Sequence, residues 1–365
     1  VLDWNRSAIL RGAVDVTALT AERVILDRLP ILEPAAESPE TEPFSLPDLP
    51  VSIEIDLAEI SQIDIAESVL GEVITAEFSA AISLISGSAD IDLSLVRHDA
   101  TEGEVQLQAA FAASTREADV NLRVFEGPGG LVSQALGVPG DPSMGVGLTG
   151  AGPLSEYTAE FSLETDGAQR LTGQVMTTTT EDTTQSFDLA LSGDLTPLLT
   201  GDAVSYIGDN TDLRAQATRA PDGALSLTEL SLRSGALSLD GDLNLDPTNQ
   251  PVAFSLIGEL NAQTGGALAL PGGDATINSA RFSLDYDRAQ SDAVRGRGEL
   301  FDLASGGVSA RSVLLGIDGR LNSDSGQIQG YRGPIVVQAN GLNHEDPDIA
   351  QALGERLTIA SVLDW

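Results

Sequence analysis

The sequence lacks most of the residues on which protein chemistry depends. Its 365 residues contain no cysteine, two histidines and only 4% aromatic residues, and every one of its 19 basic residues is arginine. Without cysteine there are no disulfides and no thiolate metal sites, a composition that also fits an oxidising compartment. Few aromatic rings argue against carbohydrate and single-stranded nucleic-acid binders, which stack their ligands on such rings.

Positive charge is scarce, and long apolar runs are missing. The net charge of −36 leaves few cations to contact phosphates, so we expect no nucleic-acid partner. The same charge disfavours peripheral docking on anionic membranes. No apolar run approaches the roughly 20 residues of a membrane helix, and no signal peptide is present. Because the chain starts at Val1 without methionine and ends at Trp365 without a polar tail, we expect a fragment of a longer protein.

Aliphatic residues in strict alternation are abundant. The motif Leu-x-Gly-x-Leu occurs at residues 191–195, 239–243 and 256–260, with an Ile variant at 317–321. Successive side chains of a strand point to opposite faces, so each copy presents one aliphatic and one polar or acidic face. The pattern predicts an all-β protein with a few short helices, built as an elongated, curled, taco-like sheet whose concave face is an apolar groove.

The motif glycines lie on the same strand face as the leucines. Glycine within a strand marks a bend or a close approach of backbone. Two interpretations remain open: the glycines allow the sheet to curl and leave space on its apolar side, or they only adjust the packing of a filled core.

Composition divides the chain into six segments. Residues 1–29 read as N-terminal strands, and residues 30–50, rich in proline and acid, as a linker or surface crossing. Residues 51–126 and 154–345 are predicted β-groove segments. Residues 127–153 form a Gly/Pro-rich insert with a short helix at 131–136, and residues 346–365 a helix followed by the next strand. A further short helix is expected at Thr196-Pro197.

Two segments match a cofactor-binding or metal-binding motif only in part. The sequence GVGLTG at 145–150 formally matches a dinucleotide fingerprint but lacks the strand before it and the helix after it. Asp240, Asp242, Asn244 and Asp246 resemble a calcium loop without its glycine and its closing glutamate. The two histidines are expected in loops or on the surface. We therefore expect no enzyme, no cofactor and no metal site.

Several segments resemble the TamB family, the AsmA-like translocation and assembly module subunits. They are GPGGLVSQALGVPG (127–140), GLTGAGPLSEYTAEFSLET (147–165), the opening VLDWNRSAILRGAVDVTALTAERV (1–24), LPDLPVSIEIDLAEI (46–60) and SGDLTPLL (192–199). Val138 stands where leucine is usual in the family, and Tyr157 where tryptophan is common.

The resemblance implies a periplasmic protein tethered to the inner membrane by an N-terminal anchor. It also implies a C-terminal domain that engages an outer-membrane barrel of the BamA/TamA type. Neither the anchor nor that domain lies in this sequence. The expected function is a conduit moving phospholipids between the two membranes. The alternatives are a scaffold for outer-membrane protein assembly and a structural, closed β-solenoid.

The residues expected to contact phospholipid acyl chains are the inward aliphatic and aromatic side chains of the alternating segments. Ordinary core packing is an equally good explanation for each of them. They are Ile53, Ile55, Leu57, Ile91, Leu93, Val105, Leu107, Leu189, Leu191, Leu239, Leu243, Phe254, Leu256, Ile317 and Leu321.

Overall fold

The computed structural model describes residues 1–28, 52–180, 183–201, 203–262, 266–270, 273–324 and 327–364. It is mostly β, which confirms the predicted class. The chain divides into two units, Val1–Thr183 and Thr184–Trp365. The boundary falls inside the predicted segment 154–345. The predicted linker at 30–50 lies outside the described residues.

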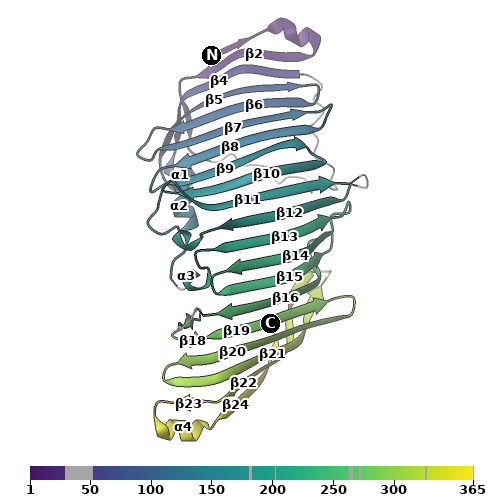
Figure 1. Cartoon of the computed structure of the whole chain (residues 1–365). Helices are drawn as coiled ribbons and strands as arrows, with labels where there is room; N and C mark the ends of the chain where they lie inside the picture. Colours follow the sequence, from purple (N-terminus) through teal and green to yellow (C-terminus); the bar gives the residue numbers. More distant parts are fainter. Residues whose placement is uncertain are drawn as a thin grey trace. The chain divides into compact units, whose positions relative to one another are not determined.

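Unit 1 is a single sheet whose neighbours follow chain order (Figure 1). Its strands pair as β1–β2–β4 and then in sequence from β4 to β11. All these pairs are antiparallel except β2–β4, and the short β3 also lies parallel to β4. The strands are β1 (Leu2–Trp4), β2 (Ala13–Ala21), β3 (Val24–Leu26), β4 (Ser52–Ile65), β5 (Ile74–Ile85), β6 (Ser88–Arg97), β7 (Gly103–Ala112), β8 (Glu117–Glu126), β9 (Met144–Pro153), β10 (Glu156–Thr165) and β11 (Ala168–Thr179).

Three short helices accompany this sheet: η1 (Arg6–Arg11), α1 (Glu67–Leu70) and α2 (Leu131–Leu136). The predicted helix at 131–136 is confirmed as α2, and Gly137 ends it with a φ of 64°. Neither η1 nor α1 was expected. The second half of the predicted insert is β9, a regular strand of the sheet, so only residues 127–143 lie outside it.

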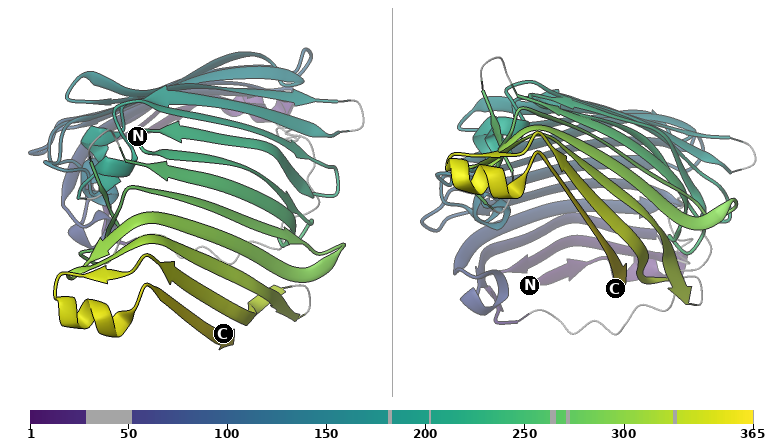
Figure 2. Two further views of the ribbon diagram at one scale, coloured as in Figure 1. Left: turned by 60° about the horizontal axis from the view of Figure 1, so that its bottom comes forward. Right: turned by 90° about the horizontal axis from the view of Figure 1, so that it is seen from below.

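Within unit 2 the strands again pair in a largely antiparallel arrangement. Its long strands pair in the order β12–β13–β14–β15–β16–β19–β20–β21–β22–β24. They are β12 (Gln185–Gly193), β13 (Thr211–Arg219), β14 (Leu225–Ser234), β15 (Leu237–Leu245), β16 (Pro251–Asn261), β19 (Ser279–Asp287), β20 (Ser291–Ser305), β21 (Val308–Asp324), β22 (Gln327–Asn340) and β24 (Arg356–Asp364). Figure 2 shows that β20, β21 and β22 bend along their length.

Short elements gather at one end of the unit 2 strands (Figure 1). They are η2 (Thr196–Leu198), α3 (Ala203–Tyr206), β17 (Leu268–Ala269), β18 (Thr276–Ile277), β23 (Asn343–His344) and α4 (Pro347–Leu353). The helix at Thr196-Pro197 is confirmed, although Asp194 rather than Thr196 accepts the first amide hydrogen bond. The helix at 347–353 is also confirmed, with Asp346 capping it and Gly354 ending it.

Neither sheet is closed or strongly curled. The closed-solenoid alternative therefore does not describe either unit, and the sheets are flatter than the taco-like curl we expected. Few of the described side chains are fully buried. In unit 2 some of them form two small clusters, one of Ala236, Leu268, Ile277 and Ala280 and one of Ala310, Val313 and Ala339.

Candidate functional site

One face of the unit 1 sheet is apolar from strand to strand. Because residues opposite one another in register share a face, the side chains of a cross-strand row can be assigned together. The row that crosses β6 to β10 consists of Leu93, Leu107, Leu122, Leu148 and Phe161. All five side chains are half-buried, because neighbouring side chains on the same face cover part of each one.

The corresponding face of unit 2 is apolar across ten strands. One unbroken row from β12 to β24 is Leu191, Leu213, Leu232, Leu239, Gly258, Phe282, Gly298, Leu315, Val337 and Ile359. On the opposite face lie acids such as Asp188, Asp240 and Asp285, in register with other polar side chains. We call these surfaces the apolar face and the polar face of each unit.

The predicted acyl-chain residues occupy the apolar faces with one departure. Ile53, Ile55, Ile91, Leu93, Val105 and Leu107 lie on the apolar face of unit 1. Leu189, Leu191, Leu239, Leu243, Phe254, Leu256, Ile317 and Leu321 lie on that of unit 2. Leu57 falls in an irregularity of β4 between Ile55 and Ala58, and its side chain is exposed.

The glycines of the apolar face leave no space on it. A Cβ added to Gly258 would lie 2.1 Å from the Phe282 ring, and one on Gly241 would lie 2.5 Å from Leu256. Gly319 faces Tyr331 in the same way. The large side chain of the next strand therefore fills the room that each glycine provides. At these three positions the glycine adjusts packing against the next strand, as the second interpretation expects, and does not leave an open space.

A cluster of charges ends the apolar face of unit 1. Arg97 follows Leu93 and Leu95 in the inward alternation of β6, and Glu126 follows Leu122 and Val124 in β8. Arg97 Nη1 donates to Glu126 at 3.0 Å, and both side chains are almost fully buried. Arg97 Nη2 also donates to Glu72 and Asp99, each at 2.9 Å.

This ionic cluster, comprising Arg97, Glu126, Glu72 and Asp99, holds α2 at the sheet end. The Glu126 carboxylate accepts from the amides of Leu131 and Val132 at 2.8 and 2.7 Å. Burial alone would raise the pKa of Asp99, but hydrogen bonds from Arg97 and from the amides of Thr101 and Thr75 hold it below its usual value. Gly103 leaves room for the Arg97 stem, which a Cβ would approach to 2.7 Å.

Sequence reasoning missed this cluster, although a signal was present. A charged residue that continues the inward phase of an alternating strand must lie at the end of the apolar face. Two such residues of opposite sign, at Arg97 and Glu126, predict an ion pair there.

An apolar cap ends the corresponding face of unit 2. Ile277 is 0% exposed and packs with Leu268, Ala236 and Ala280. Tyr206 of α3 packs against this cluster and donates its hydroxyl hydrogen to the carbonyl of Ala269. The apolar cap therefore uses side-chain packing where unit 1 uses charges.

The apparent metal and nucleotide patterns belong to ordinary strands. Asp240, Asp242 and Asn244 lie on the polar face of β15, and Asp240 pairs with Arg233 at 2.8 Å. Asp246 accepts from Thr248, from the Gln250 amide and from Arg288, which lowers its pKa to about 2. The glycines at 145–150 lie within β9.

His98 is exposed beside Glu77, whereas His344 in β23 is half-buried and accepts from the Asp346 amide. The surface position expected for the histidines thus holds for His98. Within the described ranges, no group of three or more His, Asp or Glu side chains is placed to hold a metal ion. No helix among those residues has the length and apolarity to span a bilayer.

Comparisons with known proteins return no match, whether to family models, to curated proteins or to solved structures. The resemblance to TamB consequently stays a prediction that rests on the sequence segments alone. Among the described residues, the geometry defines the candidate site: in each unit an apolar face whose side chains are mostly half-buried, with polar side chains on the reverse.

Proposed function

We propose that the apolar faces carry phospholipid acyl chains, so that the protein acts as a conduit between membranes. The observation that supports this is the ten-strand apolar row of unit 2, in which most side chains are half-buried and none is sealed beneath a second layer. A soluble protein rarely exposes so continuous an apolar surface without an apolar ligand or partner.

The energetics suit transport better than storage. Burial of an acyl methylene contributes about 0.8 kcal/mol, so a 16-carbon chain gains roughly 12 kcal/mol on leaving water. Since the chain leaves a bilayer of similar apolarity, the net change on transfer is small. Uniform aliphatic side chains provide no single site that would trap it. As part of a TamB-like assembly, the protein would work in the periplasm between the inner and outer membranes.

Native mass spectrometry with lipid extraction tests this proposal on protein purified without detergent. We expect phospholipid in several copies per chain. Leu243→Asp, which places a charge on the apolar face, should reduce bound lipid about tenfold, because a carboxylate is costly beside acyl chains. Asp242→Asn, the adjacent residue on the polar face, is the matched control and should leave bound lipid unchanged.

Two results would contradict the conduit. One is a lipid-free mass with no uptake from liposomes. The other is unfolding of Leu243→Asp by far-UV circular dichroism, because an exposed face can solvate a charge that a filled core cannot.

A further inference from the structure

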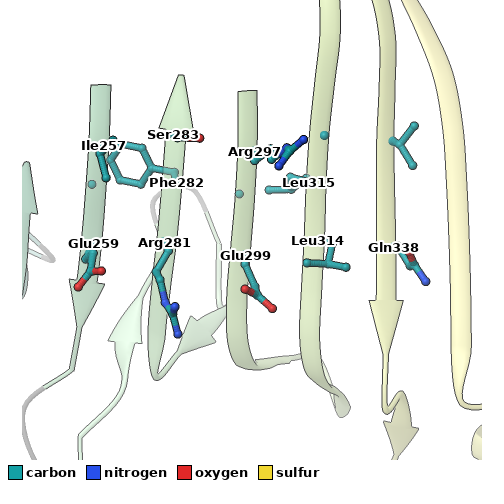
Figure 3. A pocket seen from close by; sticks show the side chains of 14 residues that line it. Ile257, Glu259, Arg281, Phe282, Ser283, Arg297, Glu299, Leu314, Leu315 and Gln338 are labelled. Atoms are coloured by element: carbon teal, nitrogen blue, oxygen red, sulfur yellow. The ribbon is translucent and has the colours of Figure 1, made fainter. Parts of the chain in front are cut away.

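A depression lies on the polar face of unit 2, opposite the proposed acyl-chain surface. It has a volume of about 530 Å³ and spans β16, β19, β20, β21 and β22 (Figure 3). Small-molecule sites commonly measure roughly 300–1,000 Å³. The register places ten of its lining residues in two cross-strand rows on the polar face, and the other four, Gly258, Phe282, Gly298 and Leu315, belong to the apolar-face row between them.

The first row contains apolar residues at positions where the alternation of the strands predicts polar ones. It runs through Ile257, Ser283, Arg297, Gly316 and Val336. Ile257 is 57% exposed, although its phase in β16 is that of Ser255 and Glu259. A Cβ on Gly316 would meet no atom within 4 Å, so the floor beside Arg297 is open. This glycine differs from those of the apolar face, which large neighbours fill.

The second row contains alternating charges. Glu259, Arg281 and Glu299 lie opposite one another, so Arg281 stands between two acids. Its guanidinium also lies 5.4 Å from the centroid of the Phe301 ring. Leu314 continues the row and adds a third exposed aliphatic side chain beside Ile257 and Val336.

Of the two arginines that line this depression, Arg281 lies opposite acids, whereas Arg297 has no carboxylate directly opposite it. Its cross-strand neighbours are Ser283 and Gly316. The adjacent Arg295 pairs with Asp318 at 3.8 Å, whereas the ion pairs of the described residues do not include Arg297. Arg297 thus has two uncharged residues directly opposite it, although the chain carries a net charge of −36.

We propose that this depression binds an aliphatic carboxylate. The carboxylate lies over Gly316 and accepts from the Arg297 guanidinium, which is suited to bidentate pairing. From Gly316 the hydrocarbon part extends either over the adjacent Leu314 and Val336 or, past Arg297, toward Ile257. A neutral aliphatic molecule would leave Arg297 unpaired, and a cationic one would be repelled by it. This site lies on the face that the conduit proposal does not use.

Photocrosslinking of the whole chain tests the site. The probe is dodecanoate with a diazirine on its chain, and the comparison probe is the same chain with a trimethylammonium group. Peptide mass spectrometry should locate carboxylate-dependent labels at Leu314 and Val336 or at Ile257. Arg297→Gln should reduce this labelling about fivefold, as expected for loss of one exposed ion pair. Arg297→Lys should restore most of it.

Arg214→Gln is the matched control, because Arg214 is an exposed arginine of the polar face opposite the uncharged Ala190 and Ser231. It should leave labelling unchanged. Equal labelling by the cationic probe, labelling confined to the apolar face, or indifference to Arg297→Gln would each overturn the proposal. Loss of lipid from the apolar face would leave these labels in place, so the two proposals fail separately.

Discussion

The two units end the same kind of apolar face with opposite chemistry. In unit 1, Arg97 is buried among Glu126, Glu72 and Asp99. In unit 2, Ile277 is buried among Leu268, Ala236 and Ala280. The first solution depends on complete hydrogen bonding, since a buried charge without its partners is costly. The second depends only on close packing. Alternating strands therefore specify the face, while its ends are free to vary.

Removal of Arg97 should produce the largest effect. Arg97→Met keeps the aliphatic stem but leaves three carboxylates without their cation, so unit 1 should lose about 3–5 kcal/mol of unfolding free energy. Hydrogen exchange followed by mass spectrometry measures this locally, with the loss concentrated in β6, β8 and α2.

Arg233→Met is the control for this change. Arg233 pairs with Asp240 in an exposed position, so its loss should cost below about 1 kcal/mol. Equal effects of the two variants would show that the ionic cluster is no more important than a surface pair.

Truncation of Ile277 should have the next largest effect. Ile277→Ala creates a cavity in the apolar cap and should lower the unfolding free energy of unit 2 by about 2–4 kcal/mol. Exchange should rise around β17 and β18 and stay unchanged in α2. A matched truncation at the exposed Ile257 should cost much less, and similar losses would argue against a cap.

A fall in pH should destabilise the ionic cluster of unit 1 and leave the apolar cap of unit 2 unaffected, with a smaller effect than either substitution. The pKa of Asp99 is lower in the folded protein than its ordinary value near 3.9, so the unfolded chain binds more protons in this range. The stability it contributes is complete above about pH 4 and is lost as the pH falls through the folded value. Corrected exchange rates in α2 should rise as the pH falls below about 4, while those at β18 stay constant.

Asp99→Asn supplies the control for the acid response. This variant should be less stable at neutral pH, and its exchange in α2 should vary less with acidification. If the pH dependence of exchange in α2 is the same with and without this substitution, a carboxylate other than Asp99 causes it.

The strands and three of the short helices follow directly from local sequence. Alternation in β6 and β15, the Gly137 stop and the Asp346-Pro347 start are all contained within a few residues, and each was predicted. The faces were also predictable, because the period of a strand is two.

What sequence reasoning missed depends on register between strands. That Gly258 lies opposite Phe282, or Gly103 opposite Arg97, is decided by hairpin lengths and bulges, which local patterns do not specify. The space that a glycine leaves can be judged only when its cross-strand neighbour is known. For the same reason, Ile257 and Val336 could not be placed beside Arg297 from the sequence.

The smallest expected effect concerns Tyr157, whose buried hydroxyl has no hydrogen-bond partner among the described residues. Its ring lies over Gly150, where a Cβ would be 2.6 Å from the hydroxyl oxygen. Burial, with the nearby Asp119 carboxylate, raises the pKa of Tyr157. Tyr157→Phe removes the cost of burying an unpaired hydroxyl and should stabilise unit 1 by about 1 kcal/mol in thermal unfolding.

Tyr331→Phe, at the equivalent glycine pairing in unit 2, is the control. It should not stabilise the protein, because the Tyr331 hydroxyl donates to the Pro334 carbonyl at 3.3 Å. Destabilisation by Tyr157→Phe would instead reveal a partner for that hydroxyl, and hence a polar site within the apolar face.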